Sequence, residues 1–239
     1  MPDRRRHRGA HPRDRELFDP SVTALLRDAV GDSSWLLSRG YSATALQKLV
    51  GDRYQLVERQ RMAVARAACS DAARERRATR RIGFADLKHR VLAVDGFNAV
   101  ISIEVALGGG LGILARDGAR RDLASIHGTY RRVLETPKAV ELLISLLEAA
   151  RPERVEWYLD RPVSNSGKLA VLLRERCAGS ALAFGVELVN DVDRRVSQPG
   201  LVAVSADSAV IDAAEGWFDA AGSVIAERIP EAWTLDLSP

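Results

Sequence analysis

Aspartates follow several of the short apolar runs in the second part of this 239-residue chain. The runs at 91–94, 155–159, 186–189 and 201–204 lead into the sequences VDGFN, YLDRP, VNDVD and VSADS. Such runs are typical of buried strands, and the carboxyl ends of parallel strands meet at one edge of a sheet. The pattern therefore predicts one crevice lined by Asp95, Asp160, Asp207 and either Asp191 or Asp193.

Carboxylates gathered in this way repel one another unless a cation neutralises them, and hard oxygen ligands suit Mg²⁺ or Mn²⁺. We therefore predict a divalent metal with Asp95, Asp160 and Asp207 as ligands and catalytic groups, and Asp191 or Asp193 beside them. Such an ion activates water and stabilises charge on a phosphodiester. The alternative for each aspartate is structural, because Asp also caps helices and turns.

Helical patterns separate these runs and indicate βαβ units, so we expect an α/β fold with a Rossmann-like parallel sheet and flanking helices. A fifth strand is expected at 224–229. The helices are expected at about 98–106, 122–134, 137–150, 166–178 and 208–220. A basic flexible arm, 1–20, and a small all-α domain, 21–82, are expected to precede this α/β domain, which spans 83–239.

Charge is divided unevenly along the chain. Residues 1–90 hold 20 Lys and Arg against 11 Asp and Glu, whereas residues 91–239 hold 15 against 21. A basic module joined to an acidic one favours a nucleic-acid partner for the first and chemistry for the second. The alternative is an arginine-rich composition on solvated helix faces.

The basic module shows three helical patterns, from Ser21 to Gly40, at 43–50 after Ser42, and at 57–70. The last two resemble a helix-turn-helix in length, although many helix pairs bind nothing. Contacts to phosphate are expected from Arg53, Arg59 and Arg61.

Further phosphate-binding groups are predicted in the acidic part. The helix start at SNSGK can bind a phosphate through backbone N–H groups, but it lacks the first glycine and the Ser/Thr of an ATPase loop. The GGGLG run at 108–112 follows a helix and is expected to be a flexible loop that closes over substrate. The predicted phosphate-binding residues are Asn165, Ser166, Lys168, Arg121, Arg131 and Arg161.

No apolar run approaches the roughly 20 residues that a membrane-spanning helix needs. The two cysteines, Cys69 and Cys177, match no metal-binding spacing, and reduced thiols are expected ahead of a single disulfide. We therefore expect a cytoplasmic protein with no membrane partner, and the sequence leaves a homo-oligomer open.

Three of the strand-end motifs resemble the PIN-like superfamily, especially its NYN branch. They are VDGFN at 94–98, the YLD that ends at Asp160, and VSADS around Asp207, and the resemblance covers roughly 90–230. It implies a Rossmann-like fold and a ribonuclease dependent on Mg²⁺ or Mn²⁺. Carried over by motif position, Asp95, Asp160 and Asp207 would be metal ligands, with Asn98 and Ser205 supporting them.

A resemblance over nearly the whole chain is to the uncharacterised family called domain of unknown function 434, in which a small helical domain precedes a PIN-like one. It is carried by SWLLSRGYS at 34–42, LVGDRY at 49–54, RQR at 59–61, HGTYR at 127–131 and DRPVSNSG at 160–167. This resemblance implies the domain order and supplies no activity.

One connection departs from the nuclease pattern. Only 11 residues, Asn190–Gly200, join the third strand to the fourth, whereas a parallel crossover usually needs about a dozen or more. The helix there must be very short or absent, which puts the fourth carboxylate in doubt.

The leading hypothesis is a metal-dependent nuclease that acts on RNA, with the basic helical module binding the nucleic acid. The alternative is a non-catalytic nucleic-acid-binding or regulatory protein with a degenerate PIN-like domain. A phosphatase would usually carry DxD at the first strand, and Phe97 stands where the second aspartate of that motif would be.

Overall fold

The computed structural model describes residues 7–124, 129–180 and 182–238, and its first part is helical. Ser42 caps α3 by accepting the N–H of Ala45 at 3.3 Å, as predicted, and Ser70 caps α5 in the same way. Helix α3 continues past Gly51, where the sequence predicted its end. The elements are α1 (Asp14–Leu17), η1 (Pro20–Val22), α2 (Thr23–Leu37), α3 (Ala43–Arg53), α4 (Glu58–Ala67) and α5 (Asp71–Arg80).

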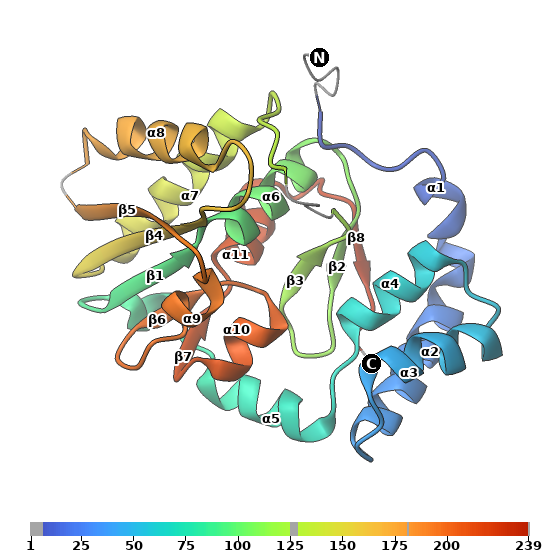
Figure 1. Cartoon of the computed structure of the whole chain (residues 1–239). Coiled ribbons are helices and arrows are strands. Elements are labelled where there is room, and N and C mark those ends of the chain that lie inside the picture. Colours follow the sequence, from blue (N-terminus) through green and yellow to red (C-terminus); the bar gives the residue numbers. More distant parts are fainter. Residues whose placement is uncertain (1–6, 125–128, 181, 239) are drawn as a thin grey trace.

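The second part forms a five-stranded parallel sheet with helices on both faces (Figure 1). Its strands lie in the order β5-β4-β1-β6-β7. They are β1 (Val91–Asp95), β4 (Arg154–Asp160), β5 (Ala183–Val189), β6 (Val202–Val204) and β7 (Gly216–Phe218). The helices are η2 (Phe84–Leu87), α6 (Gly96–Leu107), α7 (Thr136–Ala150), α8 (Ser166–Cys177), α9 (Val192–Val196), α10 (Ser208–Ala213) and α11 (Ala220–Arg228).

The strand order places a topological switch point between β1 and β6. The chain proceeds outward from β1 through β4 to β5, then returns to the other side of β1 and continues through β6 to β7. In open parallel sheets the loops diverge at such a point and leave a crevice above the strand ends. Asp95 ends β1, and Asp207 follows β6, so two of the predicted site residues flank the switch point.

Alternation along the strands divides the apolar residues between two layers. Leu92, Val94 and Trp157 pack with helices α6, α7, α8 and α11 on one face. Ala93 and Trp217 pack with α9 and α10 on the other. Both tryptophans are fully buried, so the sheet is covered on both faces, as a parallel sheet requires.

A second sheet, which the sequence patterns did not predict, joins the helical part to the α/β part. It consists of β2 (Gly112–Leu114), β3 (Arg120–Asp122) and β8 (Thr234–Asp236), in the order β3-β2-β8. Ile113 and Leu235 share one apolar core with Leu26, Val30 and Val64 of the N-terminal helices. The helical part therefore completes its core with strands from the second half of the chain.

The predictions for the C-terminal segment assigned the wrong type of element to two runs. Residues predicted as a strand at 224–229 lie mainly in helix α11, and β7 lies within the predicted helix 208–220. A short apolar run does not distinguish a strand from a buried helix. The better signal was Asp219, which begins α11 by accepting the N–H of Gly222 at 2.7 Å.

The predicted helix at 122–134 is also wrong where the structure describes it. Residues 120–122 form strand β3, and Thr129 makes a parallel bridge to Ser164. Residues 125–128 lie outside the described part of the chain. Arginines and apolar residues alternate poorly here, and the strand is set by pairing with β2.

The predicted mobile arm is fixed to the body over its described residues. Arg8 Nε donates to Glu104 Oε2 at 2.7 Å, and Asp14 is fully buried against Arg59. The glycine run beside Arg8 explains this approach, because a Cβ at Gly108 would lie 2.9 Å from the Arg8 backbone. The GGGLG segment therefore packs against the N-terminal segment, whereas the sequence predicted a loop that closes over substrate.

Two smaller expectations concern membranes and cysteines. In the ranges that the structure covers, no helix combines the length and the hydrophobicity needed to cross a bilayer. Cys69 and Cys177 are both buried, and no disulfide joins them in the structure.

Candidate active site at the carboxyl edge of the sheet

Asp95 lies at the centre of the candidate site, where β1 passes into α6. It is 7% exposed and accepts hydrogen bonds from the N–H of Asn98 at 3.2 Å and the hydroxyl of Ser205 at 3.0 Å. Gly96 is required beside it, because a Cβ there would lie 2.6 Å from the Leu159 side chain. The Asp-Gly pair of the VDGFN motif thus brings the start of α6 close to the neighbouring strand β4.

Asn98 and Ser205 connect the ends of β1 and β6. The Asn98 side-chain oxygen accepts the N–H of Ala206 at 2.9 Å. The hydroxyl of Ser205, which donates to Asp95, accepts the N–H of Asp207 at 3.1 Å. The two residues predicted to support the metal ligands therefore fix the β6 exit loop, residues 205–207, against Asp95.

Two further strand ends bring acids to the same edge. Asp160 ends β4, and α9 follows β5 as the very short crossover helix that the 11-residue connection predicted. Asp191 caps α9 by accepting the N–H of Arg194 at 3.0 Å, and Asp193 lies in its first turn.

The pKa values show that these acids sense one another. Burial raises the pKa of Asp95 to about 7, and the negative charges of Asp207 and Asp160 add to the effect. Burial also raises the pKa of Asp193, with further contributions from Asp207, Asp160 and Asp191. Because Asp193 interacts with acids from three other positions, it is the better placed of the two candidates after β5.

Three of the acids are at the same time helix caps. Asp207 Oδ1 accepts the N–H of Ala209 at 2.8 Å, and Asp95 and Asp191 cap α6 and α9. Among the described residues, no three His, Cys, Asp or Glu side chains converge as a bound metal ion would require. The structural and the metal-binding interpretations of these aspartates therefore apply to the same residues.

The donor set nevertheless fits a hard cation in its chemistry. All five acids supply carboxylate oxygens, which suit Mg²⁺ and Mn²⁺. Within the described ranges, no Lys or Arg forms an ion pair with Asp95, Asp160, Asp191, Asp193 or Asp207. As far as the described part of the chain shows, the carboxylates of this edge are not neutralised by ion pairs.

A cleft of about 330 Å³ opens beside Asp207 and Asn98. Arg66 from α4 of the helical part also lines this cleft, and its guanidinium donates to the carbonyls of Asp122 and Ala124. About a third of the Arg66 side chain is exposed, so the cleft is lined by a cationic group as well as by Asp207.

The predicted phosphate-binding residues fall into two groups. Arg161 and Lys168 are exposed. Arg161 nevertheless donates to the carbonyl of Leu188 at 2.7 Å, and Asn165 and Arg121 donate to the carbonyls of Tyr130 and Ala206. Ser166 is buried at the start of α8, and the carbonyl of Arg131 accepts a hydrogen bond from Arg8.

The three predicted arginines of the helical part also differ. Arg59 pairs with buried Asp14, and Arg61 donates to the carbonyl of Leu56 at 2.8 Å. Arg53 keeps 72% of its side chain exposed, with a pairing distance of 3.3 Å to Asp32. Arg53 is therefore the member of this set that remains available to a phosphate.

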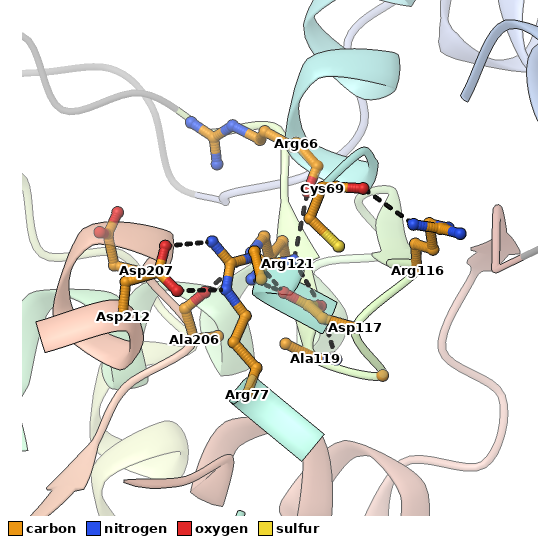
Figure 2. A network of polar contacts seen from close by, with 12 residues as sticks. Arg66, Cys69, Arg77, Arg116, Asp117, Ala119, Arg121, Ala206, Asp207 and Asp212 are labelled. Atoms are coloured by element: carbon orange, nitrogen blue, oxygen red, sulfur yellow. Dashed lines mark hydrogen bonds and ion pairs between the residues drawn. The ribbon is translucent and has the colours of Figure 1, made fainter. Parts of the chain in front are cut away.

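The sequence patterns missed a buried polar network on the other side of the β6 exit loop. Figure 2 shows Arg77 and Arg121 meeting at Asp117, close to Ala206 and Asp207. Asp117 and Gly118 form the turn between β2 and β3, and an Asp-Gly pair is a known hairpin signal. That signal could have located the hairpin, but not the arginines that meet there.

Comparison with known proteins divides the chain near the end of α5. The family model described as Domain of unknown function (DUF5616) matches residues 84–223. The one described as Protein of unknown function (DUF434) matches residues 25–80. The predicted resemblance to family 434 is thus confirmed for the helical part, while the α/β part matches a family of its own.

A relative covers most of the chain. The uncharacterised protein MJ0935 of Methanocaldococcus jannaschii is 31% identical over 188 residues, which is 78% of this chain and 88% of the relative. No solved structure matches the chain significantly.

Proposed function

We propose, from the premise that the chain belongs to the family described as Domain of unknown function (DUF5616), that it is a divalent-metal-dependent nuclease acting on RNA. The observation that carries the proposal is the group of mutually interacting acids at the switch point of the sheet. The acids after β1, β4 and β6 and the parallel strand order also support a PIN/NYN-like type for this domain.

Mg²⁺ or Mn²⁺ would be held by carboxylates of Asp95, Asp160, Asp193 and Asp207, and would supply Lewis-acid stabilisation and an acidified water. Burial and the neighbouring acids raise the pKa of Asp95 to about 7, so a bound cation would also keep this carboxylate ionised near neutral pH. Ser205 and Asn98 keep the β6 exit loop in register with Asp95. Arg66, which lines the same cleft as Asp207, would pair with a phosphate of the substrate.

Cleavage of a labelled single-stranded RNA in the presence of Mn²⁺ tests the proposal on the full chain. Asp95→Asn and Asp207→Asn are expected to lower the cleavage rate by about 100-fold or more while RNA binding is retained. Asp28→Asn, which changes an exposed aspartate on α2, is the matched control and should cleave at the wild-type rate. Unchanged cleavage by Asp95→Asn would remove the assignment.

A second function, a nucleic-acid-binding protein without catalysis, is favoured by one observation. Asp95, Asp191 and Asp207 cap helices, and no three acids converge among the described residues. Calorimetry with Mn²⁺ separates the two functions, because a degenerate site binds the ion weakly or not at all. RNA binding without Mn²⁺ binding would support the second function.

A further inference from the structure

The buried network beside the β6 exit loop joins the segments that the two family models match. Arg77 lies on α5 in the helical part, and its guanidinium contacts Asp117 at 2.6 Å and both oxygens of Asp212 at 2.6 and 2.9 Å. Asp117 lies in the β2–β3 turn, and Asp212 lies on α10, the helix that Asp207 caps. Figure 2 shows these side chains converging from three elements.

Arg121 extends the network to the backbone of the exit loop. Its two terminal nitrogens donate to Asp117 at 2.9 and 2.7 Å, and its Nε donates to the carbonyl of Ala206 at 2.8 Å. The N–H of Ala206 is held from the other side by Asn98. Both polar ends of the Ala206 residue are therefore fixed, and Asp207 follows directly.

Helix α10 is held by the same part of the chain. Arg80 of α5 donates to the carbonyls of Asp212 and Ala214 at 3.1 and 3.0 Å. The indole N–H of Trp217 donates to the carbonyl of Arg77 at 2.7 Å, which fixes α5 against β7. The exit loop thus fixes the start of α10, and hydrogen bonds from Arg77 and Arg80 fix its end.

Stability alone does not account for such an arrangement. Desolvation of buried charges cancels much of their attraction, and apolar replacements of similar volume often preserve stability. The side chains of Arg77, Arg121 and Asp117 are 6%, 8% and 0% exposed, so each carries that desolvation cost. What a charged network of fixed geometry supplies, and an apolar cluster does not, is a defined position for the groups it bonds.

We infer that Arg121, oriented by Asp117 and Arg77, is a positioning residue that fixes the Ala206 carbonyl and thereby directs Asp207 toward the carboxylate edge. The inference rests on the proposed function for the role of Asp207. It replaces the predicted phosphate contact of Arg121 with an indirect role. It also gives the helical part a function in the site, because Arg77 belongs to the segment matched by the family of residues 25–80.

Hydrogen–deuterium exchange on the full chain tests the loop directly. In Arg121→Met, the amides of residues 206–210 are expected to exchange about 10-fold faster, while those of β1 keep wild-type rates. Arg121→Lys retains a charge for Asp117, but one ammonium cannot reproduce the fork that also reaches Ala206, so a smaller increase in the same segment is expected. Arg116→Met is the matched control, because Arg116 is a largely buried arginine of the same hairpin whose partners are the Cys69 carbonyl and Asp71 rather than Asp117 or Ala206.

Titration with Mn²⁺ connects the loop to the site. Arg121→Met is expected to weaken Mn²⁺ binding about 10-fold, with Arg121→Lys in between and Arg116→Met unchanged. Faster exchange confined to the loop, with weaker Mn²⁺ binding, supports the inference. If the wild type binds no Mn²⁺ but residues 206–210 still exchange faster in Arg121→Met, Arg121 fixes the β6 exit loop and the proposed function is wrong.

Two results overturn the inference whatever the wild type does. One is an unchanged exchange rate at 206–210 in both Arg121 variants. The other is faster exchange there with Mn²⁺ binding equal to a binding-competent wild type. If Arg121→Met does not fold, Arg121→Lys alone decides between these outcomes.

Discussion

Asp95 and Asp117 lie on opposite sides of Ala206 and are buried to the same extent, 7% exposed, yet their acidities shift in opposite directions. Burial raises the pKa of Asp95 to about 7, and neighbouring acids add to it. Burial also acts to raise the pKa of Asp117, but the hydrogen bonds and charges of Arg121 and Arg77 outweigh it, and the pKa is lowered. Burial destabilises the charged carboxylate of both residues, and the hydrogen-bonding and charged partners determine whether the pKa finally rises or falls.

The comparison separates an aspartate whose charge is neutralised by arginines from one whose pKa is raised. Asp117 has two arginines, so its charge contributes to the fold. Among the described residues, Asp95 accepts a backbone N–H and a hydroxyl, and the negative charges of Asp207 and Asp160 raise its pKa. Acids left without a counter-charge at a strand-end crevice are characteristic of sites that bind a cation or move a proton.

Removing Asp117, the acid that pairs with Arg77 and Arg121, should have the largest effect. Asp117→Ala leaves Arg77 and Arg121 buried without their shared partner, so the free energy of unfolding should fall by about 3–5 kcal/mol. Urea denaturation of the variant and the wild type at pH 7 measures the difference. A loss below about 1 kcal/mol would mean that Asp117 does not neutralise the buried charges of Arg77 and Arg121.

Removing the charge of Asp95 should instead raise the free energy of unfolding. The folded pKa of about 7 lies above the ordinary 3.8, so the folded state binds more protons and stability falls as pH rises from about 4 to 7. Asp95→Asn avoids this loss and should be more stable at pH 8 by roughly 4 kcal/mol, and by less at pH 5. Urea denaturation in EDTA at both pH values measures it, and a less stable variant at pH 8 would contradict the assignment.

A cation should stabilise the uncompensated edge alone. Mn²⁺ at 100 times its dissociation constant should raise the free energy of unfolding by about 2.7 kcal/mol. The increase should be smaller in Asp207→Asn and should persist in Arg116→Met. Thermal unfolding with and without Mn²⁺ checks this, and equal increases in the wild type and Asp207→Asn would place the ion elsewhere.

The smallest effect concerns the exposed arginine of the helical part. Arg53→Ala removes a surface pair with Asp32 and should change stability by less than about 1 kcal/mol. RNA binding should weaken, and the slope of log affinity against log salt should fall by about 1. Filter binding at several salt concentrations measures the slope, and an unchanged slope would remove Arg53 from the nucleic-acid surface.

The local patterns of the sequence predicted much of the α/β part. The β1, β4, β5 and β6 strands lie where apolar runs precede aspartates, and helices α6, α7 and α8 lie where the helical period indicated them. Ser42 caps α3 as predicted, and the motif residues Asn98 and Ser205 join the ends of β1 and β6 by hydrogen bonds. These features are encoded within a few residues by periodicity, caps and turns, so they can be recognised without the fold.

Features that depend on distant partners were decided only by the tertiary structure. The small β2–β3–β8 sheet joins strands more than 100 residues apart, and β7 and α11 exchange the types that their short apolar runs suggested. Arg121 looked like a surface cation in the sequence, but it lies buried against Asp117 and Ala206. Arg77 finds its acids 40 and 135 residues away. The sequence by itself determined which residues carry charge, and folding determined which of those charges are neutralised, because a pKa depends on neighbours in space.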